Sequence, residues 1–124
     1  MIALLGRYDR QIGERGLAVL PAEWRRAMGA PSRMYLTADI NERCLDLIPQ
    51  DVFEEAAIRD RQKQEVRLVE VDGKGRIRID KDFREAADIH DVVAMVGELR
   101  LIKLWNPENL ARNGVVSVAE EDFA

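Results

Sequence analysis

The chain has 124 residues, enough for one ordinary domain or two very small ones, and each half would be only marginally stable alone. We therefore expect the two halves to share one core or to bury apolar surface against other subunits. Hydrophobic residues make up 47% of the chain and charged residues 34%, as in soluble globular proteins, and no apolar run is long enough for a membrane-spanning helix or a secretion signal.

The net charge of −4 argues against a nucleic-acid-binding protein, but the charge is unevenly distributed. Residues 1–35 carry six basic and three acidic side chains, a local net of +3 that leaves −7 for the remainder. Because the local sign decides whether a surface attracts phosphate, the first part of the chain can still bind an anionic partner. Cys44 is the single cysteine, so no internal disulfide can form and we expect a cytoplasmic location.

The first half is expected to alternate short strands with helices. A strand of mixed polarity leads into a glycine-containing turn, and the apolar strand after it ends at Pro21, whose missing N–H costs nothing in the first turn of a helix. The expected elements are strands 7–12 and 17–20, helix 21–28, strands 33–40 and 44–48, and helix 50–64. The polar end of the last helix, 59–64, is either a solvated turn or a linker between the halves.

The second half is expected to repeat this order. Asp72-Gly73 is a strong hairpin signal, Asp80 is a candidate helix N-cap, and Asn106 followed by Pro107 marks the start of a last helix. The expected elements are strands 66–71 and 76–79, helix 80–87, strands 91–96 and 99–105 around a turn at Gly97, and a short helix. The residues from 113 onward form an acidic tail that need not be ordered.

An internal repeat relates the two halves. An offset of 59 residues aligns Gly16 with Gly75 and further pairs Arg15 with Lys74, Trp24 with Phe83, and Arg25 with Arg84. We therefore expect an α+β fold of two tandem β-hairpin/helix repeats, 6–62 and 63–112, followed by the tail 113–124. The mostly antiparallel sheet is expected to close into a small β-barrel by pairing between the repeats.

The repeated segment resembles the signature of a known family. Asp72-Gly73-Lys74-Gly75-Arg76, followed by 77–79 and by Phe83-Arg84, is similar to the Asp-x-Lys-Gly-Arg signature of MraZ proteins. Residues 37–49 resemble the middle of the first MraZ repeat, and residues 93–97 with Leu104-Trp105 resemble the matching part of the second. The resemblance covers roughly residues 6–110.

The resemblance implies a non-enzymatic bacterial transcription regulator with a tandem AbrB-like, swapped-hairpin fold. It further implies a ring-shaped homo-oligomer, cytoplasmic and nucleoid-associated, that binds short direct repeats in promoter DNA, including that of its own gene. In such a ring, the signature loop of each first repeat enters the DNA major groove.

The first repeat departs from the family signature at two positions. Where the family has aspartate and arginine, this chain has Gly13 and Leu17, so that only Arg15 and Gly16 match. An arginine at the second position would reach guanine O6 and N7, which is worth about 1–3 kcal/mol of base discrimination, whereas leucine cannot. The alternative is therefore a structural or protein-interaction paralogue that keeps the fold and the oligomer without sequence-specific DNA binding. A toxin-binding AbrB-like antitoxin fits less well, because its partner-binding tail usually follows a single copy.

The candidate site residues divide into two groups. Those assigned to DNA binding are Arg10, Arg15, Gly16, Lys74 and Arg76, and those assigned to the signature and its structure are Asp72, Gly75, Arg25 and Arg84. Arg15 either contacts phosphate or is a polar turn residue. Lys74, Arg76 and Arg78 either face DNA or, with Asp72, hold the turn. The helix arginines either bond the turn backbone or meet a neighbouring subunit.

No catalytic or cofactor-binding pattern emerges from the sequence. The glycines around Lys74 lack the third glycine of a dinucleotide-binding loop. His90 is the single histidine, which gives little support to a His-based metal site or a Ser-His-Asp arrangement. Cys44 lies in an expected apolar strand, where a buried small side chain is the ordinary interpretation. We therefore expect no enzyme activity, cofactor or metal.

Overall fold

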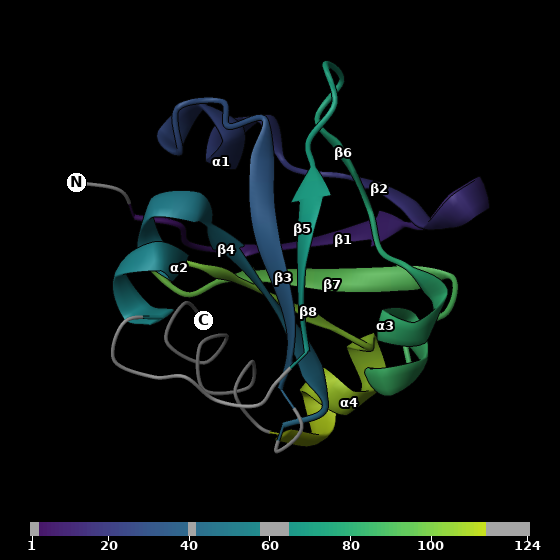
Figure 1. Ribbon diagram of the computed structural model, residues 1–124. Helices are drawn as coiled ribbons and strands as arrows, with labels where there is room; N and C mark the ends of the chain where they lie inside the picture. The colour runs from purple at the N-terminus through teal and green to yellow at the C-terminus, as the bar shows by residue number, and fades with distance from the viewer. Residues whose placement is uncertain (1–2, 40–41, 58–64, 114–124) are drawn as a thin grey trace.

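A computed structural model describes residues 3–39, 42–57 and 65–113, which form strands and short helices in an α+β arrangement (Figure 1). The strands are β1 (Arg7–Gln11), β2 (Leu17–Val19), β3 (Arg33–Asp39), β4 (Cys44–Pro49), β5 (Val66–Glu70), β6 (Arg76–Arg78), β7 (Val92–Gly97) and β8 (Ile102–Trp105). The helices are the 3-10 turn η1 (Glu14–Gly16) and the α-helices α1 (Ala22–Ala27), α2 (Gln50–Ala57), α3 (Lys81–Ala86) and α4 (Pro107–Asn113). None of these described helices is long and apolar enough to span a membrane.

The strands form one six-stranded antiparallel sheet and one separate pair. The sheet order is β1-β7-β8-β4-β3-β5, and β2 pairs with β6 in a two-stranded ribbon, hereafter the β2–β6 ribbon. The expected closed barrel is therefore wrong for the described strands, because β2 and β6 leave the sheet and pair with each other, so that β1 and β5 remain edges. Likewise, Asp72-Gly73 forms a turn, but β5 and β6 on either side of it pair with other strands.

The internal repeat is visible in the strand register. Elements β1, β2 and α1 lie at an offset of 59 residues from β5, β6 and α3. Strand β1 of the first half pairs with β7 of the second, and β5 of the second half pairs with β3 of the first, at matching positions. The halves thus exchange strands, and most of their buried apolar residues form one large hydrophobic cluster, which confirms the expectation of a shared core.

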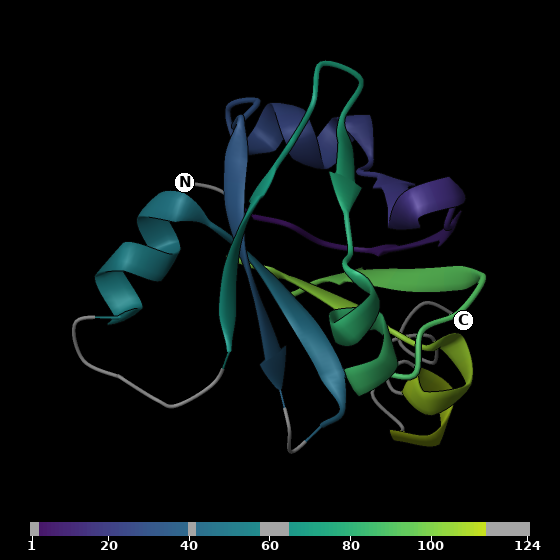
Figure 2. The ribbon, with the colours of Figure 1, turned by 45° about the vertical axis from the view of Figure 1, so that its right-hand side comes forward.

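The core lies between the inner face of the sheet and a cover made of the β2–β6 ribbon, α1 and α3. Trp24 and Phe83, at matched positions in α1 and α3, are 2% and 1% exposed within it. On the opposite face of the sheet, α2 stacks Phe53 on Tyr35 with ring centroids 4.1 Å apart, and α4 packs Leu110 over a smaller cluster. Figure 2 shows α2 and α4 well apart, toward different ends of the sheet.

Helix starts follow the sequence signals in one case and depart from them in another. Asn106 caps α4 as expected, since its Oδ1 accepts the backbone N–H groups of Glu108 at 2.7 Å and Asn109 at 3.0 Å. Asp80 occupies the N-cap position of α3 but makes no capping bond. Its carboxylate accepts instead from Arg67 Nη1 at 2.6 Å, because a guanidinium offers a stronger, charge-assisted bond.

Other boundaries differ from the sequence expectations. The last strand begins at Ile102 rather than at residue 99, because Leu99 has a positive φ of 71° and forms an isolated bridge with Leu4. The expected extension of α2 to residue 64 lies outside the described residues, as do the expected boundary at 62/63 and residues 114–124 of the expected tail. Asn113, the first residue of the expected tail, is instead the last residue of α4.

Candidate nucleic-acid interface

The β2–β6 ribbon presents a narrow outer face with two kinds of side chain. Its antiparallel register pairs Leu17 with Arg78, Ala18 with Ile77, and Val19 with Arg76. The central pair is buried in the core, and alternation along a strand turns the other two pairs outward. The outer face therefore carries two apolar side chains from β2 and two arginines from β6.

Two signature loops, 13–16 and 72–75, flank the ribbon. Because β2 and β6 are antiparallel, the loops lie at opposite ends of the ribbon, as Figure 2 shows for the purple η1 segment and the teal turn before β6. Each loop is closed by a matching backbone bond, from Gly13 N to the Leu17 carbonyl at 2.8 Å and from Asp72 N to the Arg76 carbonyl at 3.1 Å. The two loops keep equivalent closures although their side chains differ.

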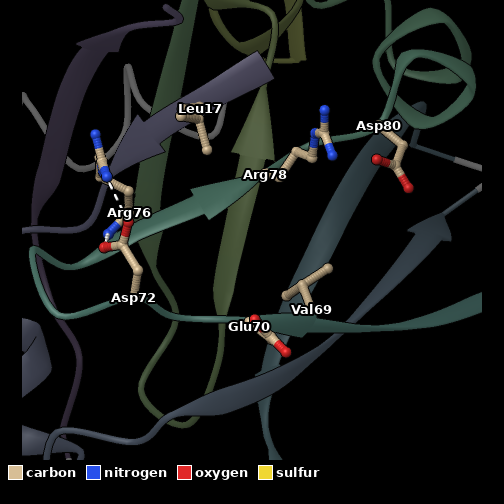
Figure 3. Close-up of a pocket in the computed structure, with 7 residues that line it drawn as sticks. All are labelled: Leu17, Val69, Glu70, Asp72, Arg76, Arg78 and Asp80. Atoms are coloured by element: carbon tan, nitrogen blue, oxygen red, sulfur yellow. Dashed lines mark hydrogen bonds and ion pairs between the residues drawn. The ribbon is translucent and has the colours of Figure 1, made fainter. Parts of the chain in front are cut away.

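The Asp72 carboxylate organises the second loop. Its Oδ1 accepts the backbone N–H groups of Lys74 and Arg76, each at 2.9 Å. Its Oδ2 accepts Arg76 Nε at 2.7 Å, and Figure 3 shows the two side chains together. The backbone hydrogen bond from Arg76, followed by its side-chain bond, lowers the pKa of Asp72 below its ordinary value. The ion pair expected between these residues is therefore present, and the first loop has no counterpart because glycine stands at position 13.

Three arginines around the ribbon are anchored through Nε. Arg76 donates to Asp72, Arg78 Nε donates to the Arg15 carbonyl at 3.0 Å, and Arg10 Nε donates to the Val19 carbonyl at 3.0 Å. In the part of the chain that the structure describes, these three guanidinium groups hydrogen-bond through Nε alone. Each side chain is thus oriented while its two terminal amino groups can still engage an acceptor pair.

The signature glycines allow close packing by arginines from the opposite half. A Cβ on Gly75 (φ 80°) would lie 2.5 Å from Arg25 Nη1, and a Cβ on Gly16 (φ 76°) would lie 2.5 Å from the Ile79 carbonyl and 3.4 Å from Arg84 Cζ. Arg25 of α1 and Arg84 of α3 therefore pack against the second and the first loop, respectively. Arg84 Nε is buried without a hydrogen-bond partner among the described residues, so that this atom does not make the bond to the turn backbone that was one of the two expected roles.

The remaining candidates fall into exposed and buried positions. Arg15, at φ 64°, and Lys74 are exposed in the two loops, and Arg78 is exposed on β6. Gly16, grouped with the DNA-binding residues on sequence grounds, is buried. In this structure, Gly16 therefore sets the conformation of the first loop. Leu17 and Val19, which face outward, are not among the interface residues predicted from the sequence, because apolar residues in a short strand ordinarily predict a place in the core.

Two surface hollows, at equivalent positions in the two halves, flank the ribbon. The second-half hollow, about 320 Å³, is lined by Leu17, Val69, Glu70, Asp72, Arg76, Arg78 and Asp80 (Figure 3). The first-half hollow, about 640 Å³, is lined by Gln11, Ile12, Gly13, Glu14, Arg15, Leu17, Val19 and Arg76. The larger volume lies where glycine and leucine replace the ion-paired aspartate and arginine.

A second charged cluster lies on the sheet face away from the ribbon, and the sequence spacing does not indicate it. Lys103 Nζ lies 2.8 Å from Asp46, 3.3 Å from Glu42 and 3.7 Å from Asp39. Burial alone would lower the pKa of Lys103, but its hydrogen bond and charge interaction with Asp46 outweigh burial and raise it. Burial raises the pKa of the nearby Cys44 thiol to about 12.

This cluster has a structural explanation. Asp39, Glu42 and Cys44 place donor atoms within 4.8 Å of one another, as a metal site would. The Lys103 ammonium, however, already supplies a positive charge to these acids, at 3.3 Å from Glu42 and 3.7 Å from Asp39. Asp46 and Lys103 also sit opposite each other where β4 meets β8, and thus link the two halves.

Comparison with known proteins gives several similar chains. No family model matches the chain. Proteins named Transcriptional regulator MraZ are 26% identical in Bacteroides fragilis (87% of this chain, 80% of the relative) and 29% in Roseiflexus castenholzii (83% and 80%). A solved chain, the solution structure of PHS018 from Pyrococcus horikoshii, matches at 14% identity and a TM-score of 0.41 over 86% of this chain and 98% of its own.

The relative from Thermomicrobium roseum, also named Transcriptional regulator MraZ, is 30% identical over 94% of this chain and 90% of its own length. Several relatives from different bacteria thus carry the same name and match most of this chain. This chain belongs to the MraZ family of transcriptional regulators.

Proposed function

We propose that this chain regulates transcription by binding double-stranded DNA through the β2–β6 ribbon and its two flanking loops. The observation that carries the proposal is the set of Nε-anchored arginines, Arg10, Arg76 and Arg78, around the ribbon. Arginine terminal amino groups match guanine O6 and N7, and a major groove about 12 Å wide admits a two-stranded ribbon. Arg15 and Lys74, in the loops at either end, are suited to the phosphates bordering the groove.

Local charge supports this surface despite the negative total. Five bases surround the ribbon, and Asp72, the acid closest to Arg76, holds that arginine in place. Asp80, the next acid along, is engaged by Arg67. Glu14 and Glu70 also line the hollows beside the ribbon, so that the five bases exceed the four nearby acids by one charge, whereas the chain as a whole has a net charge of −4.

The finer family features belong to the same proposal. The exchange of strands between halves supports an AbrB-like, swapped-hairpin arrangement of two repeats, 6–62 and 63–112. We propose that the chain assembles into a ring on promoter direct repeats, as a cytoplasmic, nucleoid-associated oligomer. Edge strand β5 supports self-association, since Val66 and Leu68 are 43% and 44% exposed beside unpaired backbone groups.

A gel-shift experiment tests the proposal. The duplex is the region upstream of the gene that encodes this chain, with a scrambled duplex as its partner. We expect discrete complexes on the native duplex, lost in Arg76→Ala and Arg78→Ala and retained in Arg100→Ala, which removes the same charge beside Glu55 and away from the ribbon. Indifference to every duplex at low salt would overturn the proposal.

One observation favours a second function. The Asp-Arg pair is absent from the first half, where Gly13 and Leu17 line the larger of the two hollows. On this alternative, the chain keeps the fold and the oligomer and binds a protein partner. It predicts that the gel-shift experiment gives no DNA complex, although the chain is still an oligomer in solution.

A further inference from the structure

We infer that the two strands of the ribbon read different bases, β6 reading guanine through Arg76 and Arg78, and β2 reading the 5-methyl group of thymine through Leu17 and Val19. This inference rests on the proposed DNA-binding function and specifies the sequence that the ribbon recognises. It assigns a reading role to the half of the chain whose signature arginine is missing.

The repeat itself supports the assignment. Under the 59-residue offset, Leu17 matches Arg76 and Val19 matches Arg78, so that each outward position of β2 has an arginine counterpart on β6. Because the four side chains share one outer face of the ribbon, the apolar pair on β2 and the arginine pair on β6 would meet the same groove of the DNA. In the major groove, that surface offers guanine acceptors and thymine methyl groups, which arginine and aliphatic side chains recognise respectively.

The exposure of the apolar pair supports it as well. Val19 is 41% exposed, and Leu17 is partly exposed on the same face, although both sit among charged groups. Leu17 and Val19 also line the larger hollow, about 640 Å³, which leaves room for a group projecting from outside. A thymine methyl in contact with them would remove apolar surface from water on both partners.

The register sets the spacing of the bases. Leu17 lies directly opposite Arg78, and Val19 opposite Arg76. Side chains directly opposite each other in an antiparallel pair have Cβ atoms about 4.5–5.5 Å apart. Stacked bases repeat about every 3.4 Å along a strand. Each apolar side chain and its opposite arginine therefore address base pairs within one or two steps of each other.

Base analogues test the inference on duplexes that the protein itself selects. Duplexes that bind the full chain are recovered from a random library, and each thymine of the selected duplex is then replaced in turn by uracil, which lacks only the 5-methyl group. We expect at least one replacement to weaken binding by about four-fold, the effect of one methyl group withdrawn from an apolar contact. In Leu17→Ala or Val19→Ala, the same replacement should have no effect.

Matched variants complete the experiment. Leu5→Ala truncates another exposed leucine, 61% exposed and outside the ribbon, and should keep the full sensitivity to uracil. Replacement of guanine by 7-deazaguanine should weaken binding to the unmodified chain, and Arg76→Ala or Arg78→Ala should abolish that sensitivity. Two variants on each strand keep the test decisive if one of them fails to fold.

The outcomes distinguish a failure of the base-reading inference from a failure of the proposed DNA-binding function. If a duplex is selected and bound but no uracil position couples to Leu17 or Val19, the reading of thymine is overturned while DNA binding stands. If the library yields no duplex that binds even at low salt, the proposed function itself is overturned.

Discussion

At the scale of single residues, the signature glycines and the helix arginines depend on one another. Gly75 and Gly16 both adopt positive φ, a region that is costly for residues with a Cβ. Each also lies against a group from elsewhere in the fold, namely Arg25 in one case and the Ile79 carbonyl in the other. The glycine in this signature is therefore required by packing as well as by backbone conformation.

Alanine substitutions should separate these two effects. Gly29→Ala, at φ 82° with open space around it, should cost about 1–2 kcal/mol from backbone strain alone. Gly16→Ala should cost more, because its Cβ also meets a backbone carbonyl. Gly73→Ala has neither problem and should change stability by less than about 0.5 kcal/mol. Urea denaturation checks this order, and equal losses at all three positions would contradict it.

Asp72 should make stability depend on pH. Its pKa is lowered in the folded chain, chiefly by the Arg76 backbone bond, so that the ionised form stabilises the fold above the unfolded pKa of about 3.9. This contribution is lost as the pH falls from that value through the lower folded pKa. Asp72→Asn should therefore be less stable than the unmodified chain at neutral pH and equally stable in strong acid.

Urea midpoints of the two proteins across this pH range provide the measurement. Glu98→Gln, which removes an exposed acid outside both loops, serves as the control. A stability difference between Asp72→Asn and the unmodified chain that stays constant down to strong acid would show that the carboxylate charge is not responsible.

At the scale of elements, the first loop shows that the signature pair acts as a unit. Asp72 holds Arg76 through Nε, and the first half lacks both partners together, with Gly13 and Leu17 in their places. Loss of one partner alone would leave a flexible arginine or an unpaired carboxylate. Paired loss keeps the loop backbone closed, since Gly13 N still bonds the Leu17 carbonyl.

Restoring the signature should accordingly need both substitutions. Leu17→Arg alone adds a cation without its positioning acid, so we expect tighter binding to all duplexes with little gain in discrimination. Gly13→Asp combined with Leu17→Arg should add about 1–3 kcal/mol of discrimination between guanine and other bases at one position. Competition binding with base-substituted duplexes measures this, and equal discrimination by the single and double variants would contradict the account.

Much of the secondary structure could be predicted from the sequence, and its pairing could not. Periodicity and caps placed β1, β2, α1 and the start of α4 to within about two residues. The hairpin signal at Asp72 led to a wrong pairing, because turn chemistry is local whereas β5 and β6 find partners in the other half. Asp80 likewise occupies the N-cap position predicted from the sequence, but its carboxylate bonds Arg67, thirteen residues away along the chain, instead of the helix backbone.

At the scale of the whole molecule, strand exchange joins the two halves in one sheet. Each edge of the sheet belongs to a different half, and the edges differ in chemistry. Strand β1 carries the ion pair Arg7–Asp9, at 2.8 Å, whereas the matching positions of β5 are Val66 and Leu68. A charged edge resists pairing with another chain, while an apolar edge invites it.

Leu68→Glu should therefore weaken self-association. A charge on the apolar edge would have to be buried in any interface formed by β5, and the oligomer should dissociate at concentrations at which the unmodified chain remains assembled. Light scattering after size-exclusion chromatography measures the change. Leu99→Glu, at a position 58% exposed next to β7, is the control. An oligomer unchanged by Leu68→Glu would exclude this edge from the interface.

The candidate site was only partly accessible to sequence reasoning. The signature directed attention to Arg76 and Lys74, but the anchoring of Arg10 and Arg78 through Nε depends on carbonyls brought close by folding. The outward orientation of Val19 has the same origin. The sequence of a short strand does not predict which of its two faces is buried in the core, since that depends on how the second half packs against the first.

The most direct test of the account is the salt dependence of DNA binding, measured by fluorescence anisotropy with the upstream duplex and its scrambled control. We expect tight binding to the native duplex, with an affinity that falls steeply with salt. Arg15→Ala should weaken both duplexes alike and lower the salt slope by roughly one unit, while Arg76→Ala should cost about 1–3 kcal/mol on the native duplex alone. Equal and weak binding to both duplexes, or none at low salt, would contradict a DNA-reading ribbon.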